Sequence, residues 1–218
     1  MQALRQTLRE IAKRDMAQDA AHDLAHLDRV WLTAQDIAET MGGATRPLLA
    51  ACYLHDLVNL PKDAPDRARA STLSAQAATP HLRALGFSGE EIAETTHAIA
   101  AHSFSAGIEP VSDTARILRD ADRLDALGAI GIARTFAVSG ALSRPFYDPT
   151  DPFAANRPLD DTAYALDHWP LKLLRLPDTM LTARGKQIAQ DRAATMRDFL
   201  TTLAAEIGST PEHPCWTS

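Results

Sequence analysis

Cysteine, long apolar runs and positive charge are all scarce in this sequence, and each scarcity excludes a class of protein. Cys52 and Cys215 are the only cysteines among 218 residues, too few for a disulfide framework. Such cysteine usage indicates a reducing compartment. No apolar run approaches the ~20 residues that a membrane span needs, and charges interrupt residues 1–15 every few positions. We therefore expect a cytoplasmic protein that is neither exported nor inserted into a membrane.

Basic residues are outnumbered by acidic ones, which bears on the partners. The chain has 22 Lys and Arg against 28 Asp and Glu, a formal net charge of −6. Binding to nucleic acid or to an anionic membrane surface needs a basic face, so we expect neither partner. A small anionic substrate is compatible with this balance if positive charge gathers locally. The sequence says little about assembly, and we expect a monomer or a homodimer.

Alternating apolar and polar runs, the pattern of half-buried strands, are also missing. Apolar residues recur instead at spacings of three and four, and the hydrophobic share of 45% suffices for one sizeable core. The sequence therefore predicts an all-α protein, a single compact helical bundle. We expect one domain over residues 1–208 and a loose C-terminal tail over residues 209–218.

Local signals predict where the helices begin and end. An amphipathic helix is expected over residues 24–41, before two glycines that end it. Thr45, followed by an Arg-Pro pair, begins a second helix that is apolar all round and ends at His55 and Asp56. The second helix has the character of a central, buried element.

Three more helices are predicted further along the chain. Ser88 and Glu91 form a capping box that opens a helix to about Ala101. Another helix is expected from about residue 113 to roughly residue 138. The C-terminal helix should span about residues 181–207.

Polar side chains interrupt these apolar helices at a few places: His26, His55 with Asp56, His102, and Asp122 with Asp125. A lone histidine on a helix face is more often a hydrogen-bonded core residue than a ligand, so no residue of this set is convincing alone. Two aspartates three positions apart share a helix face, and burying both carboxylates without a cation is costly. A divalent metal would remove that cost. Two imidazoles with two carboxylates suit Mn²⁺, Fe²⁺, Co²⁺ or Ni²⁺.

Three segments in order carry a resemblance to a known family. They are HDLAHLDRV at residues 22–30, YLHDL at 53–57 and DADRLDALG at 120–128. This set resembles the motifs of the HD-domain superfamily of metal-dependent phosphohydrolases. Stretches such as HAIAAHSFSAG and KLLRLPDTMLTARGKQIA are similar to its bacterial YedJ-like branch. The resemblance covers roughly residues 10–205 and implies these metal ligands: His26, His55, Asp56 and Asp122.

The remaining site residues are predicted from their positions beside those ligands. Asp125 is a candidate for orienting the nucleophilic water or for supporting a ligand imidazole. His102 lies at a helix end, where a proton donor to the leaving group would be useful. Lys62, in a proline-bounded loop after the His-Asp doublet, is a candidate for phosphate binding and catalysis. Further substrate-binding candidates, each of which could equally form a structural salt bridge, are Arg29, Ser103, Arg123 and Lys172.

The predicted reaction is hydrolysis of a phosphate ester or anhydride in a small phosphorylated metabolite, with a nucleotide favoured. One divalent ion, Mn²⁺, Fe²⁺, Co²⁺, Ni²⁺ or Mg²⁺, would activate the attacking water. A cyclic-dinucleotide or alarmone phosphodiesterase is an alternative that needs a second metal, for which His97 and His102 are candidates, or a purine pocket. A non-catalytic metal- or nucleotide-binding regulator is another, and the complete ligand set disfavours it.

Overall fold

The computed structural model describes residues 1–16, 23–60, 66–210 and 216. All regular elements in these residues are helices, which confirms the all-α prediction. No single helix among them is long and apolar enough to cross a membrane, and α6 with α7 reaches that length and composition only as a bent pair. The chain packs as two compact units, Met1–Asp122 and Arg123–Ser218. That residues 1–208 act as one domain stays a prediction.

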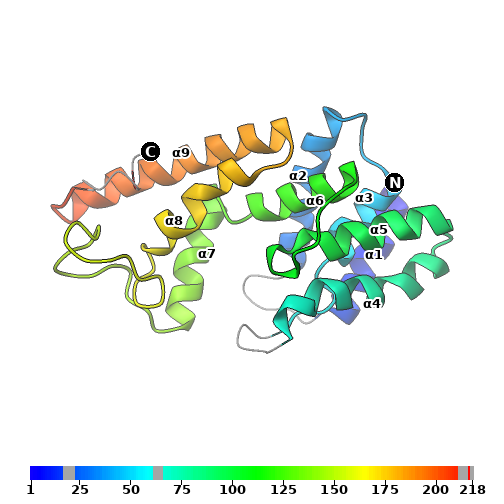
Figure 1. Ribbon diagram of the computed structural model, residues 1–218, viewed down its shortest axis with the longest axis horizontal. Helices are drawn as coiled ribbons and strands as arrows, with labels where there is room; N and C mark the ends of the chain where they lie inside the picture. Colours follow the sequence, from blue (N-terminus) through cyan, green and yellow to red (C-terminus); the bar gives the residue numbers. More distant parts are fainter. Residues whose placement is uncertain (17–22, 61–65, 211–215, 217–218) are drawn as a thin grey trace. The chain divides into compact units, whose positions relative to one another are not determined.

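The first unit is built around one buried helix. Its elements are α1 (Gln2–Asp15), α2 (Leu24–Glu39), α3 (Arg46–Leu54), the 3₁₀ helix η1 (Arg67–Arg69), α4 (Ala70–Ala84), α5 (Gly89–His102), the 3₁₀ helix η2 (Phe104–Ala106) and α6 (Asp113–Leu124). Helix α3 packs against α1, α2, α4 and α5, and every residue of α3 after the first is buried. Figure 1 shows α4 and α5 lying side by side. The apolar run behind Thr45 is thus the central helix, as predicted.

Side-chain caps fix where the helices of the first unit begin. The Asp23 carboxylate accepts a hydrogen bond from the backbone N–H of His26 at 2.7 Å, and the Thr45 hydroxyl caps α3 in the same way. Ser88 and Glu91 form the predicted capping box of α5. Because a cap sets the phase of the turns that follow, it also sets the face on which each polar side chain emerges.

One predicted helix is broken in the structure. The segment expected to be helical from about residue 113 to 138 forms α6, which ends at Leu124, and α7 (Gly128–Ala141). Gly128 has a φ of +69°, a left-handed conformation that glycine adopts without strain. A Cβ at Gly131 would lie 2.2 Å from the carbonyl oxygen of Ala126, so the turn needs glycine there as well. Helical periodicity continues across the break and could not reveal it.

The second unit packs its helices around aromatic side chains. Besides α7, it contains α8 (His168–Leu171), the 3₁₀ helix η3 (Leu173–Thr179) and α9 (Ala183–Glu206), which begins and ends within two residues of its prediction. Helix α9 packs against α7 and η3. The rings of Phe136 and Trp169 lie 5.9 and 5.7 Å from Phe199. These ring contacts join α7, α8 and α9 around the buried Trp169.

Irregular chain between α7 and α8 is held by polar contacts. The buried Asp167 carboxylate accepts two hydrogen bonds from Arg157, at 2.5 and 2.9 Å. Trp216, in the segment expected to be a loose tail, is buried and donates from Nε1 to the Phe153 carbonyl at 2.8 Å. Most of that tail lies outside the described residues.

Candidate metal centre

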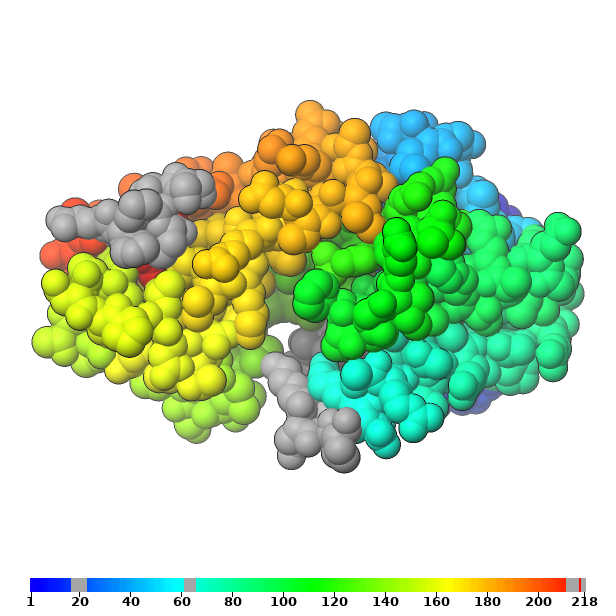
Figure 2. Space-filling view, in the orientation of Figure 1, coloured from blue at the N-terminus to red at the C-terminus, as the bar shows by residue number. Residues whose placement is uncertain are grey.

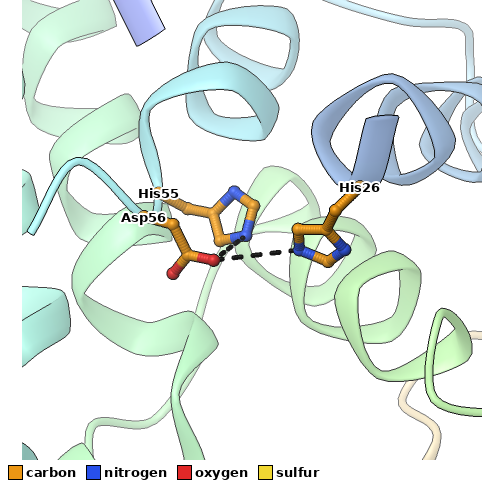
Figure 3. A group of neighbouring side chains, drawn as sticks. All are labelled: His26, His55 and Asp56. Carbon is orange, nitrogen blue, oxygen red and sulfur yellow. Dashed lines mark ion pairs between the residues drawn. The ribbon is translucent and has the colours of Figure 1, made fainter. Parts of the chain in front are cut away.

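The fold brings together all four side chains predicted as metal ligands. Nε2 of His26 and Nε2 of His55 lie 3.8 and 3.3 Å from the same oxygen, Oδ2 of Asp56 (Figure 3). One potential ligand atom from each of these residues lies within 4.8 Å of the others. Asp122, on α6, places Oδ1 3.4 Å from Nε2 of His26 and 3.8 Å from Nε2 of His55. The donors therefore come from α2, the end of α3 and α6.

His102, at the end of α5, adds a third imidazole to this cluster. Its Nε2 lies 3.7 Å from Oδ1 of Asp56, and its ring centroid is 4.9 Å from that of His55. Asp56 therefore directs one oxygen toward His26 and His55 and the other toward His102. The imidazoles are buried, whereas the side chains of Asp56 and Asp122 keep 18% and 28% of their surface exposed. The carboxylate side of the cluster is therefore the side that reaches solvent.

Backbone carbonyls orient two of the three rings. Nδ1 of His55 lies 3.0 Å from the Cys52 carbonyl, and Nδ1 of His102 lies 2.6 Å from the Ile99 carbonyl. A carbonyl oxygen can only accept, so the proton is on Nδ1 and, in the neutral ring, the Nε2 lone pair points into the cluster. This is the arrangement in which histidines bind metals.

Nε2 of His55 supplies a test of whether a cation fits. It is buried and has no hydrogen-bond partner within the described residues, although oxygens of Asp56 and Asp122 are close. A lone pair that faces two carboxylates is unfavourable unless a positive charge lies between them. The donor set fits a divalent cation.

The pKa shifts agree with this distribution of charge. Burial acts to raise the pKa of Asp122, but contact with His26 and the other imidazoles outweighs it, and the pKa falls well below its usual range. Burial, with His55 nearby, lowers the pKa of His102. Burial also acts to lower the pKa of His55, but Asp56 and Asp122 raise it overall, so a proton can take the place of a cation there. The cluster thus holds an ionised Asp122 carboxylate beside a neutral His102.

A network behind the ligands was missed by the sequence analysis. Asp28, on α2, accepts from the Tyr53 hydroxyl at 2.6 Å and from Arg5 at 2.9 Å through Oδ1, and from Arg9 at 3.0 Å through Oδ2. These bonds join α1 to α2 and α3, the helices that carry His26 and lead to His55. Asp28 is two positions after His26, and Tyr53 is two positions before His55. Both lie inside the motif segments, and this was the signal that could have identified them.

Other predicted residues of the first unit lie near the cluster in sequence. Arg29 is half-buried on α2. Ser103 follows His102 directly, and its hydroxyl shares a hydrogen bond with the Ser105 hydroxyl at 3.0 Å. Lys62 lies outside the described residues. Substrate roles for these side chains stay predictions.

The predicted residues of the second unit have partners there. Asp125 is buried and accepts from Arg134 at 2.8 Å. Arg123 donates to a hydroxyl in η3 at 3.2 Å, and Lys172 pairs with Asp161 at 2.8 Å. These contacts stabilise the second unit, and the predicted catalytic and substrate-binding roles stay untested.

Fold and cluster together define a helical protein with a centre of histidines and aspartates, and the comparisons name its family. The HD domain model matches residues 23–127, which include the whole cluster. Uncharacterised protein YpgQ of Bacillus subtilis is 32% identical over 194 residues, 87% of this chain and 86% of YpgQ. The chain belongs to the HD-domain superfamily, a family that binds divalent metal ions.

Solved structures agree with the family assignment. The crystal structure of an HD-superfamily hydrolase from Bacillus thuringiensis has a TM-score of 0.74 and 33% identity, covering 96% of this chain and 99% of that one. That of Bacillus subtilis YpgQ in complex with ADP has a TM-score of 0.72 and 28% identity, covering 94% and 95%. The resemblance seen in the motifs is confirmed at the level of the superfamily.

Proposed function

We propose that this chain is a metal-dependent phosphohydrolase that cleaves a phosphate ester or anhydride bond of a nucleotide. The observation that carries the proposal is the buried Nε2 of His55, whose lone pair faces oxygens of Asp56 and Asp122 without a hydrogen bond in the described part of the chain. Such a cluster does not stabilise the fold by packing, since apolar side chains would fill the same space with a lower desolvation cost. It is suited to hold a cation.

His26, His55, Asp56 and Asp122 would hold the metal ion. When bound, a divalent cation polarises a phosphoryl oxygen and lowers the pKa of a water molecule. The partly exposed Asp56 and Asp122 leave the substrate side of the cluster open, whereas the buried imidazoles close the opposite side. We infer that one ion suffices, and its identity among Mn²⁺, Fe²⁺, Co²⁺, Ni²⁺ and Mg²⁺ is open to experiment.

His102 is our candidate for moving the proton. Its Nδ1 is held by the Ile99 carbonyl, and its lowered pKa keeps Nε2 unprotonated near neutral pH. It can therefore accept the proton of the attacking water and return it to the leaving oxygen. The sequence position of His102 suggested a proton donor only. Here we propose that it first accepts a proton and then donates it.

The nucleotide is the substrate class that the relatives favour. The similar YpgQ structure is a complex with ADP, and we extend that ligand chemistry to this chain. A cyclic dinucleotide is the competing substrate, because His102 beside Asp56 offers one further donor to a second metal ion. A substrate panel separates the two.

The experiment is a hydrolysis screen with metal-reconstituted protein. Nucleoside mono-, di- and triphosphates and a cyclic dinucleotide are incubated with Mn²⁺, Co²⁺, Ni²⁺ or Mg²⁺, and phosphate and pyrophosphate are both measured. Asp122→Asn should lose activity on every substrate. Asp113→Asn is the matched control, since it makes the same change at an exposed position of the same helix. The proposal fails if no nucleotide is cleaved with any metal, or if Asp122→Asn is as active as the wild type.

A further inference from the structure

Phe104 is the most exposed large apolar side chain in the described residues, with 80% of its surface accessible. Exposure alone means little, because single apolar side chains are common on protein surfaces. Its position is informative. Phe104 begins η2 two residues after His102, and two residues span at most ~7 Å of chain. The phenyl ring is therefore attached at the edge of the proposed metal centre.

The backbone that carries this ring is held firmly on both sides. His102 is fixed by its Nδ1 contact with the Ile99 carbonyl, and a hydrogen bond joins the Ser103 and Ser105 hydroxyls across the ring's own position. Gly107, with a φ of +65°, ends the 3₁₀ turn. Helix η2 also packs against α4 and α5. A ring on such a turn is presented in a defined place.

Positive charge lies next to this turn. Helix η1 packs against η2, and the cyan segment with η1 adjoins the green segment with η2 on the face shown in Figure 2. Helix η1 is the tripeptide Arg67-Ala68-Arg69; Arg69 pairs with Asp66, Arg67 donates to the Leu60 carbonyl, and residues 66–69 together carry a net charge of +1. In a chain of net charge −6, this is a local excess of cations that favours a phosphate-bearing ligand.

We propose that Phe104 is the stacking platform for the base of the nucleotide whose phosphate is cleaved at the metal centre. The inference rests on the proposed function. The exposed ring would contact the base of a nucleotide, and the neighbouring metal centre would contact its phosphate. Every base has a π-face, so stacking on Phe104 gives affinity with little choice among bases. The substrate class is therefore nucleotides of either base type, bound more tightly than phosphate compounds without a base.

Phe104→Ala tests the platform through KM. The variant should raise the KM for ADP and UDP roughly ten-fold, the scale of one lost base stack. Hydrolysis of tripolyphosphate, which has no base, and the melting temperature should not change. Leu32→Ala is the matched control, because Leu32 is also highly exposed, at 68%, and should leave all KM values unchanged. An unchanged KM for the nucleotides, or an equal rise for tripolyphosphate, would overturn the proposal.

Phe104→Trp provides a readout that does not need turnover. The native tryptophans Trp31, Trp169 and Trp216 are all buried, so the new indole adds exposed, red-shifted emission. ADP with Mn²⁺ should quench that emission and tripolyphosphate should not, and the KM for ADP should return to the wild-type value. Absence of quenching refutes the platform. If the wild type cleaves no nucleotide yet ADP quenches the indole, the proposed function fails and the platform stands.

Discussion

Metal binding at the cluster should raise the melting temperature of the wild-type protein, and the size of the shift can be estimated. Oxygens of Asp56 and Asp122 lie 3.3–3.8 Å from Nε2 of the buried His26 and His55. Without a cation, a proton on His55 is what offsets the negative charge of these carboxylates. A cation at about 100 times its Kd adds ~2.7 kcal/mol by mass action. In a chain of 218 residues, each kcal/mol shifts the melting temperature by ~2–4 °C, so Mn²⁺ should raise it by ~5–10 °C over EDTA.

Differential scanning fluorimetry of two variants tests the ligand set. Asp122→Asn removes one charge and one donor, so most of the Mn²⁺-dependent shift should disappear. In EDTA the same variant should be as stable as the wild type or more so, because it relieves repulsion between two carboxylates. Asp113→Asn, at an exposed position in the first turn of α6, should keep the full shift. Equal shifts in Asp122→Asn and the wild type would refute the ligand assignment.

Three further predictions concern other residues. Asp28→Asn should cost about 2 kcal/mol in urea unfolding at pH 7, since it loses charge-assisted bonds from Arg5 and Arg9. Burial acts to raise the pKa of Asp28, but the hydrogen bonds from Tyr53, Arg9 and Arg5 lower it overall. The stability that Asp28 contributes is therefore present above the unfolded pKa of ~3.9 and is lost as pH falls through the lower folded pKa. A cost that persists undiminished well below pH 3 would contradict the assignment. Lys62→Ala should raise KM or lower kcat/KM with an unchanged melting temperature, and normal kinetics with a lower one would make it structural. Asp167→Ala should cost ~3–5 kcal/mol because it removes the buried carboxylate that pairs with the partly buried Arg157, and a loss below ~1 kcal/mol would show that the pair is dispensable.

Helix starts could be predicted from the sequence because their signals are local. Thr45, Ser88 and Glu91 act within one turn of the chain, and the structure shows each cap at the predicted residue. The break between α6 and α7 has no such signal in the apolar spacing. It depends on the left-handed Gly128 and on the close approach of Gly131 to a carbonyl, and both become visible only when the backbone is folded.

The predicted ligands meet because α2, the end of α3 and α6 place them together, but the orientation of their side chains could not be predicted from the sequence. Motif spacing gives residue types, whereas the direction of the His55 lone pair depends on a carbonyl three residues earlier. The Asp28 network needs three helices to be packed before it exists. Such contacts join residues far apart in the chain and carry no periodic signature.

Asp125 illustrates how one missed helix end changes a chemical argument. The sequence analysis placed it on the face of Asp122 because three positions on a continuous helix make nearly one turn. Helix α6 ends at Leu124, so that geometry does not extend to Asp125, whose carboxylate accepts from Arg134 in the second unit. Burial of this carboxylate is therefore compensated by a guanidinium, without need of a metal ion. A buried charge requires a counter-charge. Arg134 supplies it for Asp125, whereas for Asp122 the same rule indicates a bound cation.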